Sequence, residues 1–406
     1  MTNIRRGLLG AAGVDAGYPE VQLQAWGDNG EGQLGVGDTT DRSSPVNVGS
    51  AYAWHDLSAS TSAKPSVAAI RDGKLFTWGN NEYGQLGLSD YTNRSSPTQV
   101  GSLETWATVA MGSAHCVAIK TDGTMWSWGK NEVGALGQGD KSRSVTRSSP
   151  VQIGSGETWS QVAVTSWQPL NPPPTPNYGQ YKMRSAAVTS DGKLFTWGGN
   201  GYNSYLLGNG SFFNEPAYSA GNGHKSAPSQ VGSITTWKQV WTQGERSMII
   251  KTDGTMWTWG SGAGGASMRS TSGGSVSIAQ IGSDTDWEAC MGSSGQGMAR
   301  KTDGTLYVAG SGQSGQLGLG GGGYGFTRNS PSQVGSASYI ASSMADEHSV
   351  VVKDDGTLWT WGENSEGQLG VGNTSDTSSP VQVGSGTAWT QCVAGESGFT
   401  LATYEP

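Results

Sequence analysis

The dipeptide Trp-Gly recurs along the chain, and this repeat constrains the fold more than any other feature of the sequence. Neighbouring copies stand about fifty to seventy residues apart, a period typical of solenoids and propellers. A seventh copy is degenerate and reads Ala309-Gly310. The six complete copies begin at Trp26, Trp78, Trp128, Trp197, Trp259 and Trp361. We expect these six side chains to be structural and to wedge neighbouring repeats together.

Each repeat contains four short runs of strand-forming residues. In one representative unit the runs cover residues 105–111, 115–120, 124–129 and 150–155. Asp122-Gly123 separates the second run from the third, and Asp-Gly between two apolar runs is a strong signal for a tight β-hairpin. Repeats of four antiparallel strands are typical of propeller blades. The sequence therefore predicts an all-β fold, a seven-bladed β-propeller of four-stranded antiparallel blades.

The two ends of the chain each supply only part of a repeat. Residues 389–404 contain the first and second strand patterns but no third, whereas residues 21–27 read as a third strand. We therefore expect the N- and C-terminal strands to pair in one composite blade of residues 21–48 and 389–404. This pairing would close the ring and remove exposed sheet edges. The propeller would span residues 21–404, with residues 1–20 outside it as an N-terminal arm.

One block of the repeat carries a specific resemblance. The pattern Trp-Gly-x-Asn-x-x-Gly-Gln-Leu-Gly at residues 78–87 resembles the regulator-of-chromosome-condensation repeat, and similar blocks lie at 26–35, 128–137 and 361–370. The resemblance implies a seven-bladed propeller in which the Gly, Leu and Trp positions are structural. Members of this family include an exchange factor for a small GTPase, inhibitors of secreted enzymes, membrane-trafficking modules and repeat proteins of bacteria and phages. The resemblance therefore implies the fold and leaves the function open.

Differences in length between the repeats fall mainly on one face. In an antiparallel blade, the connections from strand one to two and from three to four emerge on the same face, which we call the decorated face. The other connections are short Asp-Gly and Gly-Ser links, and they form the plain face. The decoration is greatest in the repeat of residues 159–231, whose two long connections are rich in aromatic residues.

Exposed Trp and Tyr dominate protein interfaces, so these aromatic residues predict a partner-binding face. The prolines at 172–174 and 176 would stiffen the first of the two connections. The alternative is that the aromatic side chains pack on each other and only hold the long connections in place. The predicted partner face consists of Trp167, Tyr178, Tyr181, Tyr202, Tyr205, Phe212, Phe213 and Tyr218.

The first twenty residues lack the repeat and contain a short basic and apolar stretch with Arg5, Arg6, Leu8 and Leu9. This stretch resembles a signal peptide only superficially, because its apolar run is short, is interrupted by Gly and precedes no clear cleavage site. We expect an extended arm that becomes ordered when it anchors the protein on a neighbouring subunit. Such an arm is similar to those of phage virion proteins.

The sequence offers no catalytic or metal-binding pattern. His115 and His348 occupy equivalent places in their repeats, and His224 has no carboxylate or thiol at ligand spacing. Cys116 follows His115 on a predicted strand, so the two side chains should point to opposite faces. We expect no enzyme activity, no bound metal and no cofactor.

The composition restricts the classes of partner that the protein can bind. The net charge of −8 argues against nucleic acid, since a protein that binds the phosphate backbone needs clustered Lys and Arg. No apolar run approaches the ~20 residues of a membrane span. We therefore expect protein partners, and the aromatic residues leave glycan binding open.

Two hypotheses for the function follow. The first is a non-enzymatic structural or adhesion module, a phage virion protein of a tail, fibre or capsid surface. The arm would anchor it, and the decorated face would meet virion neighbours or a host-surface receptor. The alternative is a protein-binding regulator, such as an enzyme inhibitor or a propeller similar to the GTPase exchange factor. The first hypothesis places the protein in the virion, and the alternative places it in the cytoplasm or outside the cell.

Overall fold

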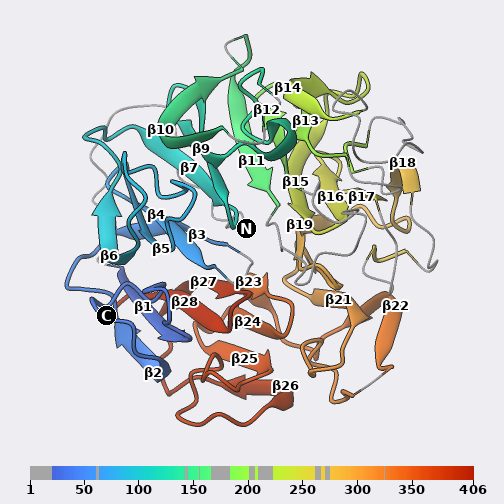
Figure 1. Cartoon of the computed structure of the whole chain (residues 1–406). Helices are drawn as coiled ribbons and strands as arrows, with labels where there is room; N and C mark the ends of the chain where they lie inside the picture. Colours follow the sequence, from blue (N-terminus) through green and yellow to red (C-terminus); the bar gives the residue numbers. More distant parts are fainter. Residues whose placement is uncertain are drawn as a thin grey trace, which may run out of the picture.

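The computed structural model describes residues 21–60, 64–140, 142, 145–154, 156–165, 183–200, 206–208, 223–260, 267–269, 275–323 and 325–406. These residues form seven four-stranded antiparallel sheets, arranged as blades around a central axis in Figure 1. The all-β seven-bladed propeller predicted from the sequence is confirmed. No helix within these ranges is long and apolar enough to cross a membrane.

Blades 1 to 6 each consist of four strands that are consecutive in the chain. Blade 1 contains β3 (Trp54–Ala59), β4 (Ser66–Arg71), β5 (Lys74–Gly79) and β6 (Arg94–Gln99). Blade 2 contains β7 (Trp106–Met111), β8 (His115–Lys120), β9 (Met125–Lys130) and β10 (Thr146–Ile153). Blade 3 contains β11 (Trp159–Val164), β12 (Arg184–Thr189), β13 (Leu194–Gly198) and β14 (Lys225–Gln230).

The next three blades follow the same order. Blade 4 contains β15 (Trp237–Gln243), β16 (Arg246–Lys251), β17 (Met256–Gly260) and β18 (Ser275–Gln280). Blade 5 contains β19 (Trp287–Gly292), β20 (Gln296–Lys301), β21 (Leu306–Ser311) and β22 (Thr327–Gln333). Blade 6 contains β23 (Tyr339–Met344), β24 (His348–Lys353), β25 (Leu358–Gly362) and β26 (Thr377–Gln382). A single turn of 3₁₀ helix, η1 (Glu132–Gly134), lies in the connection between β9 and β10.

Blade 7 is built from both ends of the chain. Its strands are β27 (Trp389–Gly395), β28 (Phe399–Tyr404), β1 (Gln22–Gly27) and β2 (Arg42–Asn47). Strands β1 and β28 pair antiparallel in unbroken register, from Gln22 opposite Tyr404 to Gly27 opposite Phe399. In Figure 1 the red strands β27 and β28 therefore lie beside the blue strands β1 and β2. The predicted composite blade is confirmed.

The first strand of every blade lies innermost, and side chains of one blade satisfy backbone donors of the next. Asp56 Oδ2 accepts a 2.7 Å hydrogen bond from the N–H of Val109, and Ser58 Oγ accepts a 2.9 Å bond from the N–H of Met111. A buried backbone donor without a partner is costly. These contacts therefore let unpaired strand edges line the central axis.

The fourth strands begin earlier than the sequence pattern predicts. The pattern places the fourth strand of blade 2 at residues 150–155, whereas β10 begins at Thr146 and ends at Ile153. The register of β10 against β9 shifts between Arg147 and Val151, around Pro150. A proline cannot donate to the ladder, but β10 is an outer edge strand where one donor is not needed. The expected boundary was wrong because these strands open on a polar Arg-Ser-Ser-Pro segment.

The Trp residues of the Trp-Gly copies join neighbouring blades through a contact that we call the blade lock. All six are at most 1% exposed. Each indole Nε1 donates a hydrogen bond of 2.8–3.0 Å to a carbonyl in the preceding blade, in its connection between strands three and four. The donor and acceptor pairs are Trp26–Gln368, Trp78–Gln33, Trp128–Gln85, Trp197–Ala135, Trp259–Leu206 and Trp361–Gln316.

Glycine completes the blade lock. Two residues after each acceptor, a Gly with positive φ lies against the same indole ring. A Cβ added at any of these positions would come within 2.5–2.9 Å of the ring. The positions are Gly35, Gly87, Gly137, Gly208, Gly318 and Gly370. The Gly at the end of the repeat block is therefore required both by its backbone conformation and by the neighbouring Trp.

Candidate functional site

The predicted partner face falls on residues that the structure does not place. Trp167, Tyr178, Tyr181, Tyr202, Tyr205, Phe212, Phe213 and Tyr218 all lie outside the described residues, and so do Arg5, Arg6, Leu8 and Leu9 of the arm. Both sets stay predictions. The connections of the decorated face in blades 6 and 7 are described throughout, and their side chains define its chemistry there.

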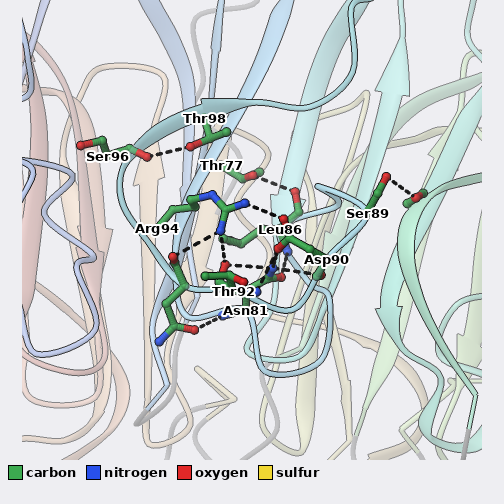
Figure 2. Close-up of polar contacts among 11 residues, drawn as sticks. Thr77, Asn81, Leu86, Ser89, Asp90, Thr92, Arg94, Ser96 and Thr98 are labelled. Carbon is green, nitrogen blue, oxygen red and sulfur yellow. Dashed lines mark hydrogen bonds and ion pairs between the residues drawn. The ribbon is translucent and has the colours of Figure 1, made fainter.

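A buried Asn holds each regular connection between strands three and four from within. Figure 2 shows this arrangement in blade 1, where Asn81 Nδ2 donates to the carbonyl oxygens of Asp90 and Thr92, both at 3.1 Å. Asn81 Oδ1 accepts from the N–H of Leu86 at 3.0 Å. Arg94 then forms an ion pair of 2.5 Å with Asp90, so the carboxylate is already compensated. The same internal role belongs to Asn29, Asn131 and Asn364.

Carboxylates gather on the decorated face of blade 6. Glu347 precedes β24, Glu363 follows β25, and the two side chains share a hydrogen bond. That contact raises the pKa of Glu347 to about 7, because two adjacent carboxylates resist ionising together, and burial and the charge of Asp346 add to the effect. Ser365 Oγ links Glu363 (3.1 Å) to Glu366 (3.5 Å). We call Asp346, Glu347, Glu363 and Glu366 the acidic sector.

The acidic sector forms no ion pair in the described part of the chain, although the charge of Arg246 acts on Asp346 from a greater distance. None of the Lys or Arg side chains placed there forms an ion pair with its four carboxylates. Asp346 instead accepts from the N–H (2.8 Å) and Oγ (2.6 Å) of Ser294 in blade 5. By contrast, Asp38 and Asp90 on the same face are paired with Arg42 and Arg94. The acidic sector is therefore a local excess of negative charge.

A polar contact crosses the central opening beside the acidic sector. Gln243 Nε2, at the end of β15, donates a 2.8 Å hydrogen bond to Glu396 Oε1 in the connection between β27 and β28. Blades 4 and 7 are not neighbours, so this bond spans the axis.

Two buried arginines lie at the first position of second strands on the same face. Arg184 Nη1 donates to the carbonyl of Gly244 and its Nη2 to the carbonyl of Arg246, both at 2.6 Å, so its guanidinium joins blade 3 to blade 4. Burial lowers the pKa of Arg184 to about 9, and that of Arg246 to about 10. Both groups remain charged at neutral pH, and the hydrogen bonds of Arg184 stabilise the junction of blades 3 and 4.

Histidines occupy the same position in two other blades. His115 Nε2 lies 3.0 Å from Ser185 Oγ, and His348 Nε2 lies 3.0 Å from Thr400 Oγ1 in the next blade. Complete burial lowers the pKa of both imidazoles to about 4, so both are neutral at pH 7. These contacts agree with their interpretation as parts of the repeat.

The remaining chemistry-bearing groups are also buried. Cys116, Cys290 and Cys392 are free and buried, and burial raises the pKa of each thiol well above its usual value, so a nucleophilic thiolate is disfavoured. His224 Nδ1 accepts from the N–H of Asn200 at 3.1 Å. Across the described ranges, no three His, Cys, Asp or Glu side chains form a group that could hold a metal ion.

The plain face repeats one structural motif. In blade 2, Lys120 Nζ lies 3.8 Å from the centre of the Trp126 ring, and Trp126 Nε1 donates to Thr124 Oγ1 at 3.0 Å. Thr124 Oγ1 donates in turn to Asp122 Oδ1 at 2.7 Å. The same chain of contacts recurs at Trp257 and Trp359. This regularity is expected of a structural element, and it leaves the decorated face as the variable one.

Sequence reasoning alone misses the acidic sector, although strand register contains its signal. His348 pairs with Gly362 across β24 and β25. The residues immediately outside that pair, Glu347 and Glu363, must then lie side by side at the decorated end of the blade. Setting the register of β24 against β25 from the Trp-Gly copy would therefore predict the contact between Glu347 and Glu363.

Comparisons with known proteins agree with this architecture. Three segments, residues 72–119, 122–167 and 355–402, match the model of the Regulator of chromosome condensation (RCC1) repeat. A second model of the same description matches residues 106–135. The chain carries RCC1 repeats. The resemblance inferred from the Trp-Gly blocks is thereby confirmed.

The curated relatives of these RCC1 repeats are diverse. The chain is 26% identical to the Ultraviolet-B receptor UVR8 of Arabidopsis thaliana over 362 residues, which cover 88% of this chain and 65% of the relative. It is 32% identical to the Probable E3 ubiquitin-protein ligase HERC6 of Homo sapiens over 180 residues, or 43% of this chain and 16% of the relative. A match of 81 residues to the X-linked retinitis pigmentosa GTPase regulator of Mus musculus is 46% identical and covers 19% of this chain and 8% of the relative. The chain thus spans less than two thirds of each relative.

Solved structures share the whole propeller. Prp20p of Saccharomyces cerevisiae superposes with a TM-score of 0.76 and 16% identity, covering 95% of this chain and 92% of that one. Human WBSCR16 superposes with a TM-score of 0.74 and 18% identity, covering 95% and 99% of the two chains. At this identity the similarity shows the fold alone.

Proposed function

We propose that this RCC1-repeat propeller is a non-catalytic, protein-binding regulator, and that its acidic sector receives a basic surface of the partner. The observation that carries the proposal is the contact between Glu347 and Glu363. Two carboxyl groups share a hydrogen bond there, with no cation from the described residues to compensate them. Such a contact costs free energy in the isolated chain. A Lys or Arg from a partner would offset this free-energy cost.

Charge complementarity of this kind accelerates encounter and selects the partner. The fold has precedent for protein binding. The structure of Prp20p is described together with its binding properties to Gsp1p and histones, and another structure of the same yeast protein has Kap60 bound to it. Those partners belong to Prp20p. They support only the general proposal that this chain binds a protein.

The proposed interaction has a defined pH dependence. In the free chain, the raised pKa of about 7 means that Glu347 is largely protonated below neutral pH. A cationic partner favours the ionised form, so binding releases a proton and tightens as the pH rises from about 6 to 8. A partner that binds elsewhere would lack this dependence.

The test is retention of proteins from the native source on the immobilised chain. We compare wild type with Glu363→Lys/Glu366→Lys, and with Asp354→Lys/Glu405→Lys as a control of equal charge change outside the acidic sector. The expected result is a protein that wild type and the control retain and the acidic-sector variant loses. Equal retention by all three would refute the role of the acidic sector.

The virion hypothesis stays a prediction, as do a host-surface receptor or a glycan as partner. Sedimentation of the native material, with mass spectrometry of particle fractions, tests it. Co-sedimentation with a large particle that depends on residues 1–20 would favour the virion and the anchoring arm. A free protein of ~42 kDa would remove that hypothesis.

A further inference from the structure

The boundary between blades 4 and 5 departs from the blade lock. Where the other six boundaries bring a Trp against a Gly with positive φ, this one has Ala309 of β21 and Met268, which has a φ of +57° and is buried. The two replacements are physically coupled. A Cβ at the Gly position meets the indole at 2.5–2.9 Å in every regular boundary, so a side chain is tolerated there only when the Trp is absent.

A second replacement at the same boundary removes another contact between the blades. Ala309 pairs across the strands with Gly297. In blades 3, 6 and 7, the residue at the position of Gly297 is Ser185, Ser349 or Thr400, and its hydroxyl donates to a carbonyl of the preceding blade at 2.8–3.0 Å. Gly297 offers no hydroxyl. Ser267 Oγ, buried on the blade 4 side, has no hydrogen-bond partner among the described residues.

A pocket of about 400 Å³ opens at this boundary. Its lining includes Met268, Arg269, Ile281, Asp284, Trp287 and Tyr307. Its volume falls in the usual range for small-molecule sites, about 300–1,000 Å³. The pocket therefore lies at the boundary that lacks the regular lock, with Met268 and Arg269 in its wall.

The pocket wall is aromatic on one side. The rings of Trp287 and Tyr307 meet edge to face with centroids 5.4 Å apart. Lys301 Nζ lies 5.2 and 5.4 Å from the two ring centres. Its ammonium is also 2.8 Å from Asp284, so that carboxylate is already paired.

Arg269 supplies the unbalanced charge. It is partly exposed and forms no hydrogen bond or ion pair with another described residue. An Arg fork recognises a carboxylate through two parallel hydrogen bonds. With Asp284 neutralised by Lys301, the pocket combines one available guanidinium with an aromatic and aliphatic wall.

We propose that the boundary between blades 4 and 5 binds a small carboxylate with a flat, apolar body. Arg269 receives the carboxylate, and Trp287, Tyr307 and Ile281 contact the body. This site is separate from the acidic sector, which attracts cations. Met268 takes the place of the lock Gly at this boundary, and the residue after it, Arg269, supplies the anchor in the pocket wall.

The test uses matched aryl acids and amides. Phenylacetate, 2-naphthylacetate and indole-3-acetate are each compared with the corresponding amide, which keeps the ring and removes the charge. Saturation-transfer NMR on the full chain detects binding, and calorimetry measures the dissociation constant. We expect at least one acid to bind about tenfold more tightly than its amide, the factor for a lost charge-assisted hydrogen bond.

Three variants assign the binding to this pocket. Arg269→Gln should weaken the acid about tenfold and leave the amide unchanged, and Arg269→Lys should fall between wild type and Arg269→Gln because it keeps charge without the fork. Arg328→Gln removes an equal charge from β22 of the same blade and should bind as wild type does. Equal binding of acid and amide, no binding by any acid, or equal affinity of Arg269→Gln and wild type would each overturn the proposal.

Discussion

The blade lock makes a quantitative prediction for two glycines that differ in one respect. Gly87 and Gly101 both have positive φ, +72° and +62°. Replacing either with Ala puts a Cβ into a left-handed conformation, at about 1 kcal/mol. At Gly101 the new Cβ meets nothing within 4 Å, whereas at Gly87 it lies 2.7 Å from Trp128 Nε1. Only Gly87→Ala therefore disturbs the contact between blades 1 and 2.

The size of the difference follows from the surroundings of Trp128. The ring is fully buried and its Nε1 donates to the carbonyl of Gln85 at 2.8 Å, so it cannot move aside without loss. Overpacking costs about 1–3 kcal/mol and a weakened hydrogen bond about 1 kcal/mol. We expect Gly101→Ala to lower the free energy of unfolding by about 1 kcal/mol and Gly87→Ala by about 3–4 kcal/mol.

Calorimetry and urea denaturation measure both variants. For 406 residues the unfolding entropy is roughly 0.8 kcal/mol/K, so each kcal/mol lowers Tm by about 1 °C. The expected Tm decreases are about 1 °C for Gly101→Ala and 3–4 °C for Gly87→Ala. In a Trp128→Phe background the gap between the two should shrink, because the indole nitrogen is gone. Equal decreases in both variants would refute the steric argument.

Three further predictions concern other parts of the ring. Ala309→Trp should lower Tm alone but raise it in a Met268→Gly background, with a coupling free energy of about 1–3 kcal/mol in the double-mutant cycle; additive effects would contradict the paired replacement. Glu363→Gln should stabilise the protein at pH 8 but not at pH 4, because the pKa of Glu347 is raised from 4.5 to about 7 on folding and wild-type stability falls as the pH rises through that window. Allowing for solvent screening of a half-exposed group, we expect about 1 kcal/mol in denaturation at the two pH values, and an equal shift at both would exclude the carboxyl pair as its source. A chain without residues 389–406 should lose cooperative melting in calorimetry, because β1 then has no inner neighbour; an unchanged transition would contradict closure through blade 7.

The fold could be predicted because its determinants are local and repeated. Trp78 to Gly87 already contains the lock Trp, the Asn that organises the following loop and the Gly that meets the next Trp. The same contacts recur from repeat to repeat. The number of blades can therefore be predicted even though one copy, Ala309-Gly310, is degenerate. The ends of the fourth strands were harder to predict, because edge strands interrupted by Pro have weak periodicity.

The candidate site was predicted less well, for a different physical reason. Aromatic content pointed to two long connections, and those lie outside the described residues. The acidic sector depends on the proximity of Glu347 and Glu363, which are separated in sequence and look like ordinary surface charges. Likewise, Met268 reads as an ordinary loop residue until the structure shows that the six other boundaries have a Gly with positive φ at this place. Departures from a repeat become informative only once the contact that they replace is known.

The composite blade also affects how the chain can fold during synthesis. Strand β1, whose Leu23, Ala25 and Trp26 are buried in the core, leaves the ribosome long before its inner partner β28 has been made. At about 5–20 residues per second, β1 waits some 20–80 s for that partner. Throughout this interval an apolar strand has one unpaired edge that could pair with other chains. We therefore expect chaperones to bind it. A circular permutant that begins at Trp389 would place all four strands of blade 7 together at the start of translation and should need less assistance.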